Sequence, residues 1–94
     1  MESRRRIVCK IFGRVQGVMF RDFVARNAKK FGLIGEVRNL DDGTVYVIAE
    51  GAKVQLEEFS TAMKKGSMLS RVDDVGVDWD EPSNEFDNFR IIYY

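Results

Sequence analysis

The sequence of 94 residues provides enough chain for one small domain, and its 45% hydrophobic and 32% charged residues are the balance of an ordinary globular protein. It contains no histidine and a single cysteine, which excludes a disulfide within the chain, the common zinc sites and catalysis by a histidine base. No apolar run reaches the roughly 18 residues that span a bilayer, and none suits a secretory leader. We therefore expect a single cytoplasmic domain over residues 1–94, without contact to a membrane.

Charge is divided unevenly along the chain, although 15 lysine and arginine residues balance 15 acidic ones. Residues 1–40 carry ten basic and three acidic side chains, whereas residues 41–94 carry five basic and twelve acidic ones. A basic half favours an anionic ligand. The arginine run at residues 4–6 indicates a solvated strand end that discourages pairing between sheet edges.

The first half of the chain predicts a strand, a glycine loop, a helix and a second strand. Apolar residues alternate over residues 5–13, which is typical of a buried strand, and Cys9 lies at its centre as a small hydrophobe. After the loop, helical spacing brings the following side chains to one face: Phe20, Phe23, Val24, Asn27, Ala28 and Phe31. Gly32 ends this helix, and residues 34–39 form the second strand.

The second half repeats the alternation of strand and helix. A tight turn at residues 40–43 leads into a β-branched strand over residues 44–50, and a helix over residues 53–65 follows. Residues 75–79 and 89–94 form two more strands. This β-α-β-β-α-β order with an additional C-terminal strand predicts a ferredoxin-like, split βαβ sandwich of the α+β class, with two helices on one face of an antiparallel sheet.

The loop before the first helix has the features of an anion site. Gly13 and Gly17 allow sharp turns that expose backbone N–H groups. The helix that follows has no Ser, Thr, Asp or Asn at its cap position, so its first N–H donors need water or a ligand, and Arg21 lies in its first turn. Each of these residues also has a simpler interpretation when it is considered alone. The glycines could be ordinary turn residues, and Arg21 could lie on a solvated helix face. Asn39 could be the residue that starts the hairpin turn.

The expected topology brings Asn39 to this loop. A right-handed crossover helix makes the first two strands parallel, so their C-terminal ends share one edge of the sheet. Asn39 at the end of the second strand then lies beside Arg21, although 18 residues separate the two in sequence. The sequence therefore predicts one site that combines an arginine and an amide with an anion cradle.

Two sequence blocks resemble those of the acylphosphatase family. Residues 13–21, GRVQGVMFR, resemble its signature Gly-x-Val-Gln-Gly-Val-x-Phe/Tyr-Arg, and residues 35–45, GEVRNLDDGTV, resemble its second block Gly-x-Val-x-Asn-x-x-Asp-Gly-x-Val. The resemblance implies a hydrolase, independent of metal and without a cofactor, that splits small-molecule acyl phosphates into carboxylate and inorganic phosphate. It also implies that Arg21 binds the phosphate and that Asn39 holds the attacking water. The backbone N–H groups implied to complete the phosphate site are those of Gln16, Gly17, Val18, Met19 and Phe20.

The chemistry of these side chains agrees with those roles. A guanidinium presents a planar fork to two phosphate oxygens, and phosphoryl transfer depends mainly on positioning and charge stabilisation. The conjugate acid of the leaving carboxylate has a pKa of about 4, so departure needs no general acid and a site without histidine suffices. Because an amide is no base, we expect Asn39 to orient the water while a phosphate oxygen takes the proton.

Two alternatives stay open at this point. A protein of this fold can bind a phosphorylated ligand without hydrolysing it, and related folds bind RNA through aromatic residues on the exposed sheet face. The third strand offers only Tyr46 for that purpose, and the C-terminal half is acidic. We therefore expect no nucleic acid partner, and a monomer with at most weak pairing between edge strands.

Overall fold

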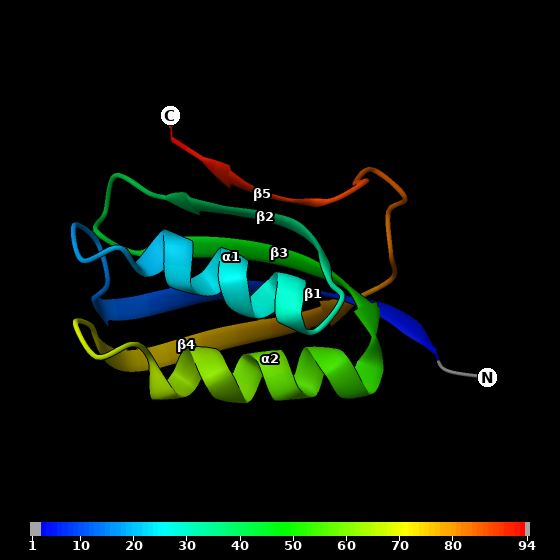
Figure 1. The fold of residues 1–94 in the computed structure, drawn as a ribbon, viewed down its shortest axis with the longest axis horizontal. Helices are drawn as coiled ribbons and strands as arrows, with labels where there is room; N and C mark the ends of the chain where they lie inside the picture. Colours follow the sequence, from blue (N-terminus) through cyan, green and yellow to red (C-terminus); the bar gives the residue numbers. More distant parts are fainter. Residues whose placement is uncertain (1–2, 94) are drawn as a thin grey trace.

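The computed structural model describes residues 3–93, which form five strands and two helices (Figure 1). In chain order the elements are β1 (Arg4–Arg14), α1 (Phe20–Lys30), β2 (Ile34–Asn39), β3 (Val45–Ala52), α2 (Lys53–Lys65), β4 (Arg71–Asp80) and β5 (Phe89–Ile92). The predicted order is confirmed, and β2 and α2 have the predicted bounds. Within residues 3–93 neither helix has the length and apolar character needed to cross a membrane.

The sheet has the strand order β4-β1-β3-β2-β5. β1 pairs antiparallel with β4 and β3, and β2 pairs antiparallel with β3. β1 and β2 therefore run in the same direction, and their C-terminal ends lie at the same end of the sheet, as predicted. β5 departs from the predicted antiparallel arrangement and pairs parallel with β2, because β4 ends at the end of the sheet where β2 begins, and residues 81–88 cross there from one edge of the sheet to the other (Figure 1).

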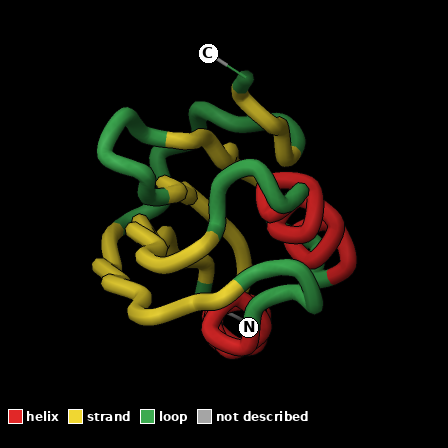
Figure 2. The backbone as a smooth tube through the Cα atoms, turned by 90° about the vertical axis from the view of Figure 1, so that its left-hand side faces the viewer, coloured by secondary structure: helices red, strands yellow, loops and turns green. Residues whose placement is uncertain are grey.

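Both helices cover one face of the sheet, and the core lies between these two layers (Figure 2). Alternate residues of β1 and β3 are buried there: Ile7, Cys9, Ile11, Val45, Val47 and Ala49. The helices contribute Phe20, Val24, Ala28, Leu56, Phe59 and Met63. Each large apolar side chain buried in this way contributes roughly 1.5–3 kcal/mol. Burial also raises the pKa of the Cys9 thiol to about 12, so Cys9 acts as the small hydrophobe that the sequence predicted.

The other face of the sheet is closed at one end by the connection between β4 and β5. Glu50 on β3 is 1% exposed and accepts hydrogen bonds from the backbone N–H and the hydroxyl of Ser83, at 2.9 and 2.8 Å. Arg6 forms an ion pair with the same carboxylate at 3.5 Å. The predicted solvated arginine end is therefore wrong for Arg6, because β1 is an interior strand and this side chain is largely covered.

Candidate active site

The end of β1 and the loop that leads to α1 contain three residues with positive φ. Gly13 has φ 133° and Gly17 has φ 73°, which are conformations that glycine adopts readily. A Cβ on Gly13 would also lie 2.1 Å from the carbonyl oxygen of Arg71, so the neighbouring strand β4 requires glycine at this position. Met19 has φ 60° at the N-cap of α1, which costs a residue with a side chain roughly 1–2 kcal/mol. Backbone strain of this kind is typical of functional sites.

The start of α1 offers N–H donors to a ligand. No side chain caps the helix, as predicted, and its first turn carries Arg21. Within residues 3–93, the N–H groups of residues 16–19 donate to no backbone acceptor. The partial positive charge at a helix N-terminus adds to the attraction for an anion. Four of the five N–H groups predicted to bind phosphate, those of residues 16–19, therefore have no backbone acceptor in the described part of the chain.

The side chain of Gln16 fastens this loop to the hairpin between β2 and β3. Its Nε2 donates to the carbonyl oxygens of Leu40 and Thr44, each at 2.8 Å. The sequence predicted a role for the backbone N–H of Gln16 alone, because nothing in the local pattern indicates acceptors that lie 24 and 28 residues away. The link fixes the loop relative to Asn39, which directly precedes Leu40.

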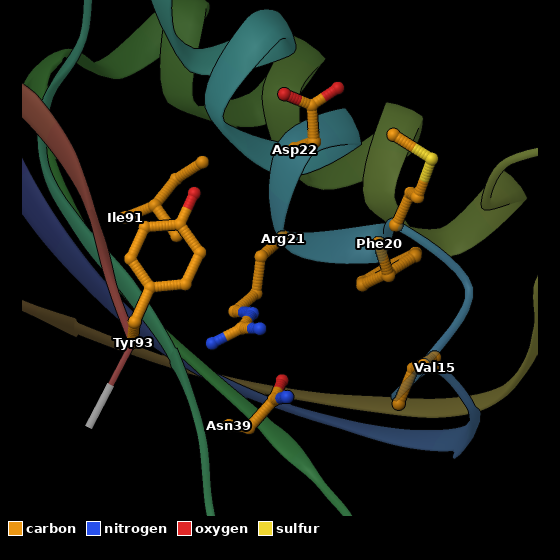
Figure 3. Close-up of a pocket in the computed structure, with 9 residues that line it drawn as sticks. Val15, Phe20, Arg21, Asp22, Asn39, Ile91 and Tyr93 are labelled. Atoms are coloured by element: carbon orange, nitrogen blue, oxygen red, sulfur yellow. The ribbon is translucent and has the colours of Figure 1, made fainter.

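Asn39 ends β2 and lines the same pocket as the loop, as the topology predicted. Its Oδ1 is buried and accepts no hydrogen bond from the part of the chain that the structure describes. Leaving a buried acceptor unpaired costs about 1–3 kcal/mol, so this oxygen is suited to a donor that arrives with water or a ligand. Figure 3 shows the amide of Asn39 and the guanidinium of Arg21 pointing toward one another.

The C-terminal strand holds the guanidinium of Arg21. Its Nη1 donates to the carbonyl oxygen of Ile92 at 3.1 Å, and its Cζ lies 4.8 Å from the centre of the Tyr93 ring, which is a cation–π contact. Within the described residues, the other N–H groups of the fork donate no hydrogen bond. The sequence did not identify Ile92 and Tyr93 as partners of Arg21. The composition of residues 89–94 predicts a strand, but it does not predict which other segments that strand contacts.

Arg21 and Asn39 line one pocket of about 400 Å³ at this end of the sheet (Figure 3). The other lining residues are Val15, Gly17, Met19, Phe20, Asp22, Ile91 and Tyr93. A pocket of this size suits a small molecule. Asp22 is the one carboxylate among these lining residues, and it forms an ion pair with Arg26 at 3.3 Å. Residues 3–93 contain no group of three or more His, Cys, Asp and Glu side chains placed to hold a metal ion.

The remaining predicted residues lie at the edges of this pocket. Gln16 lines an adjoining hollow that also includes Arg21 and Asn39. Val18 lines a groove on the other side of the loop, together with Met19 and Asp22. The side chains of Gln16 and Val18 do not line the main pocket. The prediction for these two residues concerns only their backbone N–H groups.

The fold and the pocket together define a small α+β protein of the ferredoxin-like type, with a pocket where a loop meets the start of a helix. The acylphosphatase family model matches residues 7–91. An acylphosphatase from Bacillus licheniformis is 49% identical over 86% of this chain and 90% of its own, and one from Salinibacter ruber is 40% identical over 95% and 94%. The crystal structure of acylphosphatase from Bacillus subtilis superposes with a TM-score of 0.91 at 40% identity, covering 95% of this chain and 99% of that one. The chain belongs to the acylphosphatase family.

Family membership confirms what the two sequence blocks predicted, an acylphosphatase and hence a hydrolase. The likeness to the Bacillus subtilis structure confirms the ferredoxin-like fold. The blocks at residues 13–21 and 35–45 form the loop, the start of α1 and the hairpin, which are the segments that surround the pocket.

Proposed function

We propose that the protein hydrolyses acyl phosphates to a carboxylate and inorganic phosphate at this pocket, without a metal ion or a cofactor. The observation that carries the proposal is the juxtaposition of Asn39 and Arg21 in one pocket, beside the free N–H groups of the loop. The unpaired buried oxygen of Asn39 can accept a hydrogen bond from a water. The guanidinium of Arg21 and the N–H groups of the loop can hold a phosphate next to that water.

Arg21 and the loop bind the phosphoryl group in this mechanism. The guanidinium donates to two phosphate oxygens, and the N–H groups of residues 16–20 donate to the oxygens on the loop side. Because Ile92 and Tyr93 already hold the guanidinium, it needs little rearrangement when substrate binds. Donors fixed in advance stabilise the charge of the transition state more than donors that must first be ordered.

Asn39 orients the attacking water. The water donates one hydrogen bond to Oδ1 and attacks phosphorus in line with the bond to the acyl oxygen, which breaks as the new P–O bond forms. The electron pair of the broken bond leaves with the carboxylate, and the proton of the water passes to a phosphate oxygen. Inorganic phosphate and the free carboxylate are the products, and no step requires a base with a pKa near neutrality.

We further propose a cytoplasmic monomer whose single domain spans residues 1–94 and binds no nucleic acid. On the exposed face of the sheet, β4 presents the side chains of Asp74, Asp78 and Asp80, and these repel a phosphate backbone. An RNA-binding module needs a basic flank beside its aromatic residues. The acidic edge strand thus favours a small-molecule substrate over RNA.

Hydrolysis of acetyl phosphate, measured with and without EDTA, tests the proposed function. We expect turnover that EDTA leaves unchanged. No turnover would favour a protein that binds phosphorylated ligands only, and turnover that disappears with EDTA would contradict the metal-independent mechanism.

The role of Asn39 is tested with Asn39→Ala. We expect kcat to fall about 100-fold while inorganic phosphate still inhibits, because the variant loses the water and keeps the cradle. Asn88→Ala is a matched control, since Asn88 is exposed on the connection before β5 and lies outside the pocket. Loss of phosphate binding in Asn39→Ala would instead assign Asn39 to binding or folding.

A further inference from the structure

The mouth of the pocket carries two large side chains that are exposed in the free protein. Met19 is 70% exposed and Tyr93 is 73% exposed, and both line the pocket that contains Arg21 and Asn39. We propose that these two side chains receive the acyl part of the substrate, so that the enzyme favours acyl phosphates with an apolar and especially an aromatic acyl group. This inference rests on the proposed hydrolysis at the same pocket.

The direction of attack places the acyl group at the mouth. In an in-line displacement, the attacking water and the leaving oxygen lie on opposite sides of phosphorus. The water is held at the buried Oδ1 of Asn39, on the floor of the pocket. The acyl oxygen and the carbon chain attached to it therefore point away from the floor, toward the exposed side chains of the lining.

The chemistry of the mouth suits a flat apolar group. One face of the Tyr93 ring lies against the guanidinium of Arg21, which places the ring beside the proposed phosphate site. Figure 3 shows Tyr93 on one side of the pocket and Val15 and Phe20 on the other. The flexible thioether of Met19 adapts to rings of different shape and contacts them favourably.

The backbone explains why Met19 is so exposed. Its left-handed conformation at the N-cap turns the residue out of the helix and leaves its side chain largely exposed, beside a groove that it shares with Met68 and Leu69. Phe20, the next residue, is buried in the core. The chain thus maintains a strained residue with an apolar side chain directly at the pocket mouth, where a small polar residue would cost less.

The test compares benzoyl phosphate with acetyl phosphate in the wild type, Met19→Asn, Tyr93→Ser and the double variant. Asparagine is chosen because it tolerates the left-handed conformation of residue 19. We expect the ratio of kcat/KM for benzoyl over acetyl phosphate to fall about fivefold to tenfold in the double variant. If Tyr93→Ser also disturbs Arg21, the rates for both substrates fall by the same factor, and the ratio of the two kcat/KM values is unaffected. Val54→Asn is the control, because Val54 is an exposed apolar residue on α2 that lines neither this pocket nor the adjoining groove of Met19, and its ratio should equal that of the wild type.

A second measurement needs no variant. Phenylphosphonate and methylphosphonate differ only in the group that reaches the mouth, and we expect phenylphosphonate to inhibit the wild type about fivefold more strongly. If the wild type hydrolyses both substrates but neither the variants nor the inhibitors discriminate, the acyl surface is refuted and the proposed function stands. If the wild type hydrolyses neither acyl phosphate, the proposed function itself fails.

Discussion

Replacing Gln16 with methionine removes the side-chain link between the glycine loop and the hairpin that presents Asn39. The glutamine loses two hydrogen bonds of 2.8 Å, to the carbonyl oxygens of Leu40 and Thr44. Each oxygen keeps one other donor, because the N–H of Gly43 donates to Leu40 at 3.2 Å and the N–H of Leu40 donates to Thr44 at 2.9 Å. The loss is therefore that of two ordinary hydrogen bonds, about 1–3 kcal/mol of unfolding free energy in total, without the larger penalty of orphaned acceptors.

The same change should also lower activity, by a free energy comparable to the loss of stability. The loop supplies the phosphate donors and the hairpin supplies the water, so loosening one against the other misplaces the water relative to phosphorus. A misplacement of about 1 Å can cost up to 100-fold in rate, and we expect kcat/KM for acetyl phosphate to fall about tenfold to 100-fold.

Urea unfolding and steady-state hydrolysis of acetyl phosphate measure the two effects of Gln16→Met. Gln55→Met is the matched control, because Gln55 lies on α2, away from the pocket, and should keep both the stability and the rate of the wild type. If Gln16→Met unfolds at the wild-type urea concentration and turns over at the wild-type rate, the link has no part in positioning the site.

Two further predictions concern the backbone of the loop and the charge of the hairpin. In thermal or urea unfolding, Gly13→Ala should cost about 2–4 kcal/mol because its Cβ would meet a carbonyl of β4, whereas Gly17→Ala, with no atom within 4 Å of its Cβ, should cost only about 1 kcal/mol. Equal costs would refute this reasoning. Hydrogen bonds from Thr44 lower the pKa of Asp42 below its usual range, so its stabilising effect is present above about pH 4 and is lost as the pH falls toward the depressed value. Asp42→Asn should therefore flatten the decline of stability in acid, measured by urea unfolding between about pH 5 and pH 2, and an unchanged decline would contradict the assignment.

The elements and the meeting of Asn39 with Arg21 followed from local patterns. Helical spacing marked the bounds of the helices, and one topological rule, the crossover that makes β1 and β2 parallel, was enough to place Asn39 beside the loop. These features depend on sequence periodicity and on chain handedness, which are both readable without coordinates.

The parts that the sequence did not predict are contacts between distant segments. Ile92 and Tyr93 hold Arg21 across 71 and 72 positions, and the position of β5 depends on which edge of the sheet is still unpaired. Arg6 was expected in solvent, but it lies on an interior strand under the connection that binds Glu50. These contacts depend on how the whole chain packs, so they cannot be predicted from the sequence of a short segment.

The central claim, that Arg21 binds the substrate phosphate as a two-pronged donor, is tested most directly by Arg21→Lys. The lysine keeps the positive charge and loses the planar fork, so we expect kcat/KM for acetyl phosphate in EDTA to fall at least about 100-fold. Arg26→Lys is the control on the same helix, five residues further on, where the side chain is exposed and pairs with Asp22, and it should retain wild-type turnover. Near-normal turnover in Arg21→Lys, with unchanged inhibition by inorganic phosphate, would remove Arg21 from the site and contradict the mechanism.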